Sequence, residues 1–256
     1  MIEYFLQEIP IRSLSIEMEG VIVIVVVVII AAIISIAVSV RVYKNKKYKK
    51  TTYYQITKYP YSSLKYDKGK FGEYVTYKNL QSFESAGGKF LFNVYIPKAN
   101  NEMTEVDILL ICSKGLFVFE SKNYSGWIFG NEAHKNWTQT LPQGGGRSHK
   151  ERFYNPIMQN ASHIKHLRRL VGENLPVRSI IVFSERCTLK DITIRSKDVS
   201  VVKCNNVLAA VKKICGKTEA DHLTQMEIND IYNKLYPYTQ VSYEEREQHT
   251  NNIRMY

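Results

Sequence analysis

The chain has 256 residues, of which 45% are hydrophobic and 23% charged, and its formal net charge is +11. It contains four cysteines and no C-x-x-C pair, so we expect neither a disulfide framework nor a structural zinc site. No internal repeat is visible in the sequence. These properties exclude a small disulfide-bonded scaffold and a repeat protein, and they leave room for one compact domain of about 190 residues with its own core.

The N-terminal part is typical of a membrane anchor. Residues 1–20 form a short tail with four glutamates and one arginine, and residues 21–40 carry no charge. About twenty apolar residues are needed for a helix that crosses a bilayer. A cleaved signal peptide is the alternative, but its apolar region is shorter and its leading segment is basic. We therefore predict a permanent transmembrane helix at residues 21–42.

The charges on either side of this segment predict its orientation. Six Lys and Arg residues lie within residues 41–50, whereas the preceding tail is acidic. The positive-inside rule then predicts a single-pass protein of the cell membrane, with its N-terminus outside and its C-terminal domain in the cytoplasm. The basic flank is expected to attract anionic lipids by roughly 1 kcal/mol per cation. Tyrosines interleaved with lysines in residues 43–66 indicate a juxtamembrane linker, although the same pattern suits single-stranded nucleic acid.

Residues 67–237 are predicted to form a mixed α/β domain, followed by a polar tail at 238–256. The expected elements are a helix at 71–85, a strand at 90–96, a hairpin of 106–111 and 116–119, strands at 127–129 and near 137, a helix at 155–171, strands at 177–183 and 199–202, and helices at 207–215 and 220–235. The glycines at 144–146 lack the lysine of a phosphate-binding loop, so we interpret them as a flexible connection. The expected architecture is a mixed central sheet flanked by helices.

The predicted hairpin carries a cluster of charged residues at one end. Asp107 lies in its first strand, and Glu120, Ser121 and Lys122 follow its second. Because the turn at 113–115 folds the second strand back along the first, we expect Glu120 to lie beside Asp107. Two carboxylates and a nearby ammonium group are what metal-assisted phosphodiester hydrolysis requires. The alternative is an ordinary solvated strand end with a simple salt bridge.

Further motifs flank this cluster in a specific order. They are Gly69-Lys70-Phe71-Gly72-Glu73, Asn93-Val94-Tyr95-Ile96-Pro97, Thr104-Glu105-Val106-Asp107, Glu120-Ser121-Lys122, Asn123-Tyr124-Ser125-Gly126-Trp127-Ile128-Phe129-Gly130, Trp137-Thr138-Gln139 and Asn155-Pro156-Ile157-Met158-Gln159 before His163. Over about residues 66–175 the series resembles the nuclease-related domain (NERD) family, a branch of the PD-(D/E)xK restriction-endonuclease-like superfamily. The resemblance implies a restriction-endonuclease-like α/β sandwich, here preceded by one transmembrane helix.

The resemblance also implies a role for each residue of the cluster. Asp107 and Glu120 would bind Mg²⁺, with Mn²⁺ as an alternative ion, together with the main-chain carbonyl of Ser121. Lys122 would orient or help deprotonate the attacking water and stabilise charge in the transition state. The sequence departs from the superfamily pattern at one point, because valine rather than proline precedes Asp107.

Two assisting residues are implied as well, and each has a purely structural alternative. Glu73 would reach the metal through water, although a carboxylate in the first turn of a helix is favoured by the helix dipole alone. Gln159 would contact the substrate or the waters of the metal. It shares a helix face with His163, and such a face is usually just solvated. His163 and His166 lack the glutamate and third ligand of a zinc-binding helix, so we do not expect zinc.

The sequence therefore predicts a membrane-anchored cytoplasmic nuclease that depends on Mg²⁺ and cleaves nucleic acid, with DNA preferred over RNA. Outside the tail and basic flank the chain holds 28 Lys and Arg against 20 Asp and Glu, a charge that attracts phosphate backbones but also serves solubility. One alternative is a non-catalytic, membrane-tethered module with the same fold that binds nucleic acid or protein. Another is an envelope-associated structural protein that depends mainly on its basic linker.

Overall fold

The structure, a computed structural model, describes residues 11–98, 102–217, 220–242 and 244. It divides the chain into two compact units, residues 1–50 and 51–256. In the first unit the described part is a single helix, α1 (Ile11–Lys49), of 39 residues. Much of the predicted N-terminal tail lies outside the described residues.

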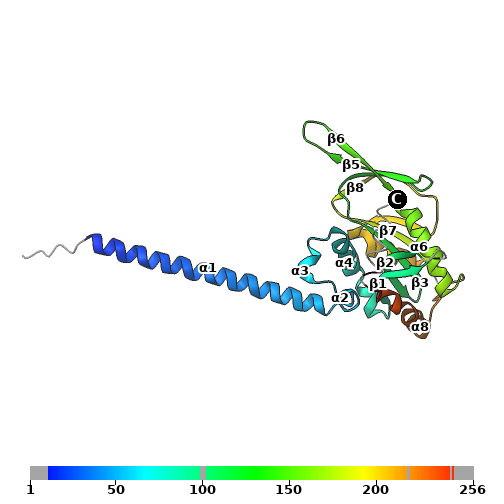
Figure 1. The fold of residues 1–256 in the computed structure, drawn as a ribbon, viewed down its shortest axis with the longest axis horizontal. Coiled ribbons are helices and arrows are strands. Elements are labelled where there is room, and N and C mark those ends of the chain that lie inside the picture. Colours follow the sequence, from blue (N-terminus) through cyan, green and yellow to red (C-terminus); the bar gives the residue numbers. More distant parts are fainter. Residues whose placement is uncertain (1–10, 99–101, 218–219, 243, 245–256) are drawn as a thin grey trace, which may run out of the picture. The chain divides into compact units, whose positions relative to one another are not determined.

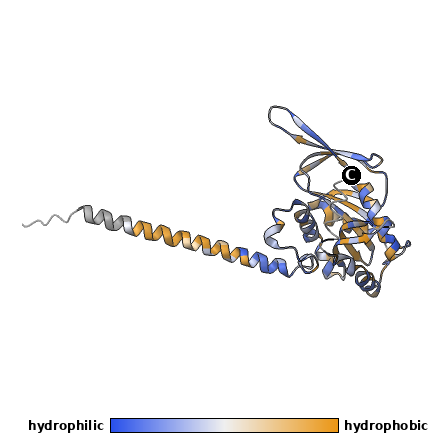
Figure 2. Cartoon of the chain, in the orientation of Figure 1, coloured by the Kyte–Doolittle hydropathy of each residue, from blue (hydrophilic) through white to orange (hydrophobic). Residues whose placement is uncertain are grey.

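Helix α1 could span a membrane by its length and composition. Within its segment Gly20–Lys49, the most apolar stretch of 18 residues has a mean hydropathy of 3.6 and no buried residue. The large apolar side chains of residues 21–42 are exposed, and Figure 2 shows them as a continuous hydrophobic stretch followed by hydrophilic residues. An exposed apolar surface of this extent requires a cover of lipid or protein. The predicted apolar helix is confirmed, and its insertion in a membrane stays a prediction.

The second unit is a mixed α/β domain with two sheets (Figure 1), as the sequence predicts for its fold class. The first sheet has the order β1-β2-β3-β7-β9, with β1 (Lys89–Pro97), β2 (Met103–Cys112), β3 (Gly115–Lys122), β7 (Val177–Phe183) and β9 (Val199–Lys203). Strands β1 to β3 are antiparallel, and β7 and β9 continue the sheet parallel to β3. The second sheet has the order β6-β5-β4-β8, with β4 (Gly126–Asn131), β5 (Asn136–Pro142), β6 (Ser148–Tyr154) and β8 (Cys187–Thr193).

Helices flank the first sheet. They are α2 (Thr52–Thr57), α3 (Tyr61–Leu64), α4 (Lys68–Leu80), α5 (Ser82–Ser85), α6 (Pro156–Val171), α7 (Val207–Gly216) and α8 (Gln225–Leu235), with 3-10 turns η1 (Cys204–Asn206) and η2 (Tyr236–Thr239). Helix α4 approaches Ser121 of β3, whereas α6 approaches Glu120. Neighbouring residues of a strand point to opposite faces, so α4 and α6 cover opposite faces of the sheet.

Strands β6 and β8 were not predicted from the sequence. Strand β6 is the edge of the second sheet, and its residues 148–152 are exposed. The glycines expected in a flexible connection form the turn between β5 and β6, where the main-chain N–H of Gln143 donates to the carbonyl of Arg147 at 2.8 Å. Gly145 and Gly146 have φ values of 72° and 75°, which residues with a side chain rarely adopt. This segment is therefore the tip of a hairpin.

Residues 51–66, assigned to a linker by the sequence analysis, form part of the second unit. The Tyr53 side chain of α2 is fully buried, with its ring centroid 4.9 Å from that of Phe92 in β1 and 6.3 Å from that of Tyr77 in α4. Its hydroxyl donates to Oε2 of Glu73 at 3.3 Å. Aromatic residues that resemble a membrane-interface pattern in the sequence thus contribute to the core of the domain.

We expect Tyr53→Ala to lower the free energy of unfolding of the second unit by about 3–5 kcal/mol, because it removes a buried ring and leaves a cavity. Tyr66→Ala is the matched control, since Tyr66 is 89% exposed and exposed substitutions usually change stability by less than about 0.5 kcal/mol. Urea unfolding of the full chain in detergent measures both. Equal stability of the two variants would show that α2 is not part of the domain.

Candidate functional site

The register of β2 and β3 sets the geometry of the site. Their ladder begins at the turn and its last pair is Ile108 with Phe119. The next residues on each strand are Asp107 and Glu120, which therefore lie opposite one another. The main-chain N–H of Ser121 donates to Oδ2 of Asp107 at 2.9 Å. The structure thus brings the two expected carboxylates, and the residue expected to supply a carbonyl, to one place.

Helix α6 supplies the partners of Lys122 and Glu120. Asn155 caps this helix by accepting a hydrogen bond from the main-chain N–H of Ile157, and proline occupies its first position. One turn further, Oε1 of Gln159 accepts a hydrogen bond from Nζ of Lys122 at 2.9 Å. The same ammonium lies 2.8 Å from Oε1 of Glu120. Lys122 is therefore held between a carboxylate and an amide oxygen.

His163, one turn after Gln159, contacts the other oxygen of Glu120. Its Nδ1 lies 2.6 Å from the hydroxyl oxygen of Thr104, and its Nε2 lies 3.2 Å from Oε2 of Glu120. The contact between Nε2 and Oε2 does not have the geometry of a hydrogen bond. Neither of these two atoms has a hydrogen-bond partner among the described residues. A buried polar atom without a hydrogen bond calls for a water or an ion. Oε2 of Glu120 is thus available to a further ligand.

The charges around Glu120 favour its ionised form. Burial raises the pKa of Glu120, but Lys122 and the nearby His163 outweigh this effect and leave the pKa below its ordinary value. Burial lowers the pKa of Lys122, because it disfavours the charged form. The carboxylates of Glu120 and Asp107 have the larger, opposite effect, so the pKa of Lys122 is raised above its ordinary value. Lys122 is therefore an ammonium group at neutral pH, as expected from its acidic neighbours.

A second group of polar residues lies on the α4 side of the sheet. Nζ of Lys70 is 3.0 Å from Oε1 of Glu73 and 3.6 Å from Oε1 of Glu105. Nδ2 of Asn93 donates to the same two carboxylates, at 3.3 Å and 2.9 Å. Burial raises the pKa of Glu73, and Lys70 opposes this effect only in part. Among the described residues Glu73 and Asp107 share no hydrogen bond, and Glu73 acts on Asp107 by the charge of its carboxylate.

The regular alternation of side chains along strand β1 is interrupted at Asn93, where the polar residues on the α4 side and those on the α6 side meet. The ring of Phe92 packs on Tyr77 of α4, and three residues later Tyr95 donates to Glu105, which pairs with Lys70 of the same helix. Regular alternation would place positions 92 and 95 on opposite faces. Asn93 lies between them with a φ of 51°, which is uncommon for a residue other than glycine. Such strained positions are frequent at functional sites.

Asp107 lies between the two groups, in an environment that disfavours its ionised form. Burial and then the Glu120 carboxylate raise the pKa of Asp107 well above its ordinary value, with smaller contributions from Glu73 and Glu105. The cluster holds four carboxylates against two ammonium groups, those of Lys70 and Lys122. Its side chains therefore carry more negative than positive charge when all are ionised.

These residues fit a divalent cation of the Mg²⁺ type. Among the described residues no group of three or more His, Cys, Asp or Glu side chains is placed so that it could hold a metal ion by itself. Mg²⁺ does not need such a set, because it usually binds one or two carboxylates and keeps several waters. The cluster has more carboxylates than ammonium groups, and Oε2 of Glu120 accepts no hydrogen bond among the described residues. Both features suit such an ion.

Comparison with known proteins identifies the family of the chain. The family description "nuclease-related domain" matches residues 68–184. The chain is also 33% identical over 168 residues to an uncharacterized protein of Bacillus anthracis, a match that covers 66% of this chain and 75% of that protein. The chain belongs to the nuclease-related domain family. No solved structure matches it. The family predicted from the sequence is confirmed, and the matched region of this nuclease-related domain contains every expected site residue.

Several residues of the site were not assigned a role by the sequence analysis. Glu105 precedes Asp107 by two positions, so strand alternation could have identified it. Lys70 lies three positions before Glu73, a residue that was expected in the site, and this is the spacing of an ion pair on a helix. His163 was noted in the motif series and on the helix face of Gln159, and it was rejected as a zinc ligand. Its contact with Glu120 depends on how α6 packs on β3. The position of Asn93 depends on a backbone conformation that the sequence does not indicate.

We expect Asp107→Asn to stabilise the nuclease-related domain in EDTA, and to do so more as the pH rises. The folded protein holds the Asp107 proton more tightly than the unfolded chain, so stability is lost as the pH rises from about 3.8 through the raised pKa. Asparagine retains an acceptor for Ser121 and cannot ionise. Unfolding of both proteins by urea between pH 4 and pH 9 measures the difference.

The control is Asp230→Asn, on the exposed surface of α8. It should change stability by less than about 0.5 kcal/mol at every pH. If Asp107→Asn destabilises the protein increasingly toward alkaline pH, the Asp107 carboxylate is stabilised by the fold and our description of the charge cluster is wrong.

Proposed function

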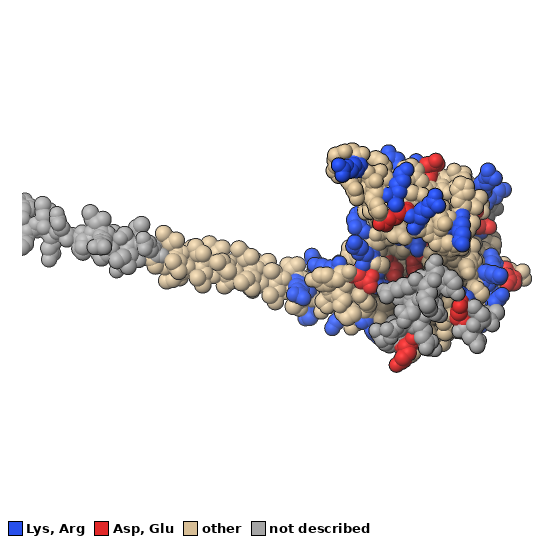
Figure 3. Space-filling model, turned by 45° about the horizontal axis from the view of Figure 1, so that its top comes forward, with Lys and Arg blue, Asp and Glu red and all other residues tan. Residues whose placement is uncertain are grey.

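We propose that the nuclease-related domain hydrolyses phosphodiester bonds of nucleic acid, preferably DNA, with Mg²⁺ or Mn²⁺ as cofactor, as expected for a member of the PD-(D/E)xK superfamily. The observation that carries the proposal is the joint position of Asp107, Glu120 and Lys122, with both acids at the end of the β2–β3 ladder and the ammonium bonded to one of them. A polyanionic substrate suits the formal net charge of +11, and Figure 3 shows Lys and Arg side chains spread over the face that it presents.

The side chains would divide the work as follows. Asp107 and Glu120, with the main-chain carbonyl of Ser121, would hold the cation, which supplies charge to the scissile phosphate and activates a water. Lys122 is an ammonium in this environment, so it would donate hydrogen bonds to phosphate oxygens and stabilise their developing charge. Gln159 would keep the Lys122 amine in place through its 2.9 Å hydrogen bond.

Two neighbouring residues, His163 and Glu73, would position the metal-binding carboxylates without touching the substrate. His163 lies between Thr104 and Glu120 and would fix the orientation of the Glu120 carboxylate, as outer partners of metal ligands commonly do. Glu73 is tied to Lys70 and Asn93, so it would act on Asp107 by charge and through water. Loss of either residue should weaken metal binding more than it changes the chemical step.

We expect Asp107→Ala and Lys122→Ala each to reduce metal-dependent cleavage about a hundredfold or more, because each removes a group that acts on the reacting phosphate. The full chain in detergent is incubated with plasmid, linear duplex and single-stranded DNA in Mg²⁺ and in Mn²⁺. Lys212→Ala, at an exposed position of α7, is the matched control and should retain activity. Equal activity of wild type and both site variants would reject the assignment.

Metal titration separates catalysis from mere binding. A nuclease of this kind should show one saturable Mg²⁺ or Mn²⁺ site in calorimetry that is lost in Glu120→Ala. A protein that binds DNA but shows no such site is the non-catalytic module, and the proposed activity is then wrong.

We also propose that α1 anchors the protein in the cell membrane with its N-terminus outside and its C-terminal domain in the cytoplasm. A fluorescent protein fused to the C-terminus should be bright in cells and protected from external protease. Replacing the six Lys and Arg residues of 41–50 by glutamine should give mixed orientations, because those cations set the topology. Arg41→Lys keeps the charge and should leave the orientation unchanged. Full protease sensitivity of the wild-type fusion would contradict the proposal.

A further inference from the structure

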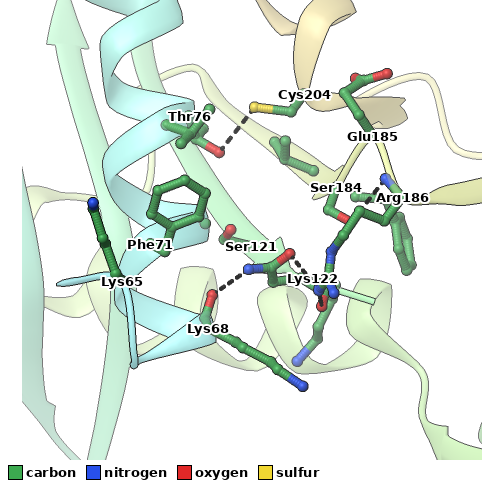
Figure 4. A pocket seen from close by; sticks show the side chains of 15 residues that line it. Lys65, Lys68, Phe71, Thr76, Ser121, Lys122, Ser184, Glu185, Arg186 and Cys204 are labelled. Carbon is green, nitrogen blue, oxygen red and sulfur yellow. Dashed lines mark hydrogen bonds between the residues drawn. The ribbon is translucent and has the colours of Figure 1, made fainter. Parts of the chain in front are cut away.

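A cavity of about 400 Å³ opens beside Lys122, between α4 and the ends of β3 and β7 (Figure 4). Its wall includes apolar side chains, Val75 of α4 and Val182 of β7 among them, and the ring of Phe71. Phe71 is 43% exposed, so part of its ring is open to a ligand in the cavity. A cavity of this size is within the range of small-ligand sites. Asp107 and Glu120 do not line it, so the cavity adjoins the carboxylates without being the same site.

The charged residues of the cavity wall are mostly basic. They are Lys65, Lys68, Lys122 and Arg186, with Glu185 as the acidic member. Glu185 does not compensate them, because its carboxylate lies 3.1 Å from Nζ of Lys203 and accepts the main-chain N–H of Asn205 at 2.7 Å. Lys65 and Lys68 have no acidic partner within ion-pair distance in the described part of the chain. The cavity is thus apolar on one side and positively charged at its opening.

Two contacts fix the basic part of the opening next to Lys122. The guanidinium of Arg186 donates to the main-chain oxygen of Asn123 at 2.6 Å and to its side-chain oxygen at 2.9 Å. The Asn123 amide in turn donates to the carbonyl of Lys68, as Figure 4 shows. Asn123 thus connects Arg186 on the β7 side to the main chain at the start of α4, so the two sides of the opening are held together without a ligand.

The thiol in the cavity wall does not offer a reactive group. Sγ of Cys204 is within hydrogen-bond distance of the hydroxyl of Thr76 and the amide of Asn79. Burial raises the pKa of Cys204, so the thiol stays protonated. The cavity is therefore suited to binding rather than to chemistry.

We propose that this cavity takes one unpaired nucleotide of a nucleic-acid strand, with its base on the ring of Phe71 and its phosphate beside Lys68 and Arg186. A planar base joined to an anionic phosphate matches an exposed aromatic ring beside fixed cations. A base inside a duplex is stacked on its neighbours and cannot reach the ring, so the preferred substrate is single-stranded or locally opened. The inference rests on the proposed function, and it narrows the substrate to strands with an unpaired nucleotide next to Lys122.

The test is binding of a fluorescent 12-nucleotide oligothymidylate to the full chain in detergent and EDTA, where no cleavage is needed. Phe71→Ala should weaken binding about tenfold, the usual effect of removing one stacking partner. Phe129→Ala is the matched control, because Phe129 is 37% exposed on β4 and lies outside the cavity. It should bind as the wild type does. Unchanged melting temperatures show that the variants are folded.

Three further arms identify the ligand. A duplex of the same length should bind wild type and Phe71→Ala equally, because its bases are not available. Free thymidine monophosphate should compete only weakly if the cavity takes a nucleotide within a strand. If the free nucleotide competes as well as the unlabelled oligonucleotide does, the requirement for a strand is wrong. Lys68→Gln should weaken single-strand binding and reduce its salt dependence by about one phosphate contact, whereas Lys212→Gln should not.

The outcomes separate this inference from the proposed function. Equal binding of the oligonucleotide by wild type and Phe71→Ala overturns the inference, even if the protein cleaves DNA in Mg²⁺. An effect of Phe71→Ala that persists in an Asp107→Ala background, without cleavage, supports the nucleotide site and shows that it is independent of catalysis. Absence of binding to any nucleic acid overturns both.

Discussion

The register of the β2–β3 hairpin determines which side chains meet in the site. The strands are joined by two residues, with Cys112 paired to Gly115, so the position of the turn sets every later pair. Gly115 has a φ of 111°, and a Cβ at this position would lie 2.5 Å from the carbonyl oxygen of Pro176. Only glycine fits there. A slip of one residue would move the acidic side chains to the other face and separate Asp107 from Glu120.

The buried apolar strands stabilise the domain and so allow a destabilising charged site at their ends. Strand β3 is buried from Gly115 to Glu120, and its central residues pair with β2 on one side and β7 on the other. Charged side chains appear only where β2 and β3 stop pairing, beside the ends of the ladder. The carboxylates repel one another there, and the central strands supply the stability that the cluster lacks. Loss of stability at a charged site is a common consequence of preparing it for function.

The sequence predicts the elements with a clear apolar pattern well. Strand β7 and the hairpin follow from continuous apolar runs, and α6 follows from Asn155 and the proline after it. Helix α8 begins at Gln225, later than predicted, although the capping box of Thr224 and Glu227 marks its start.

Other elements depend on partners that the sequence does not indicate. The residues of strand β6 do not alternate between apolar and polar. This strand lies at the edge of the second sheet beside β5, so its side chains need not be buried. Strand β8 is held by parallel pairing with β4, more than fifty positions away along the chain. In the site, the two acids and Lys122 could be predicted from spacing and family resemblance. The contribution of α2 could not, because Tyr53 reaches Glu73 only after the chain has folded back onto β1.

The composition of β6 has a consequence for the behaviour of the protein in solution. An open strand edge offers unsatisfied main-chain groups to any other extended chain, and this is a common route to aggregation. The exposed side chains on β6 include His149, Lys150 and Arg152, with Glu151 between them. Charged side chains on an edge strand disfavour pairing with another extended chain. The hairpin can therefore extend from the domain while discouraging strand pairing between neighbouring molecules.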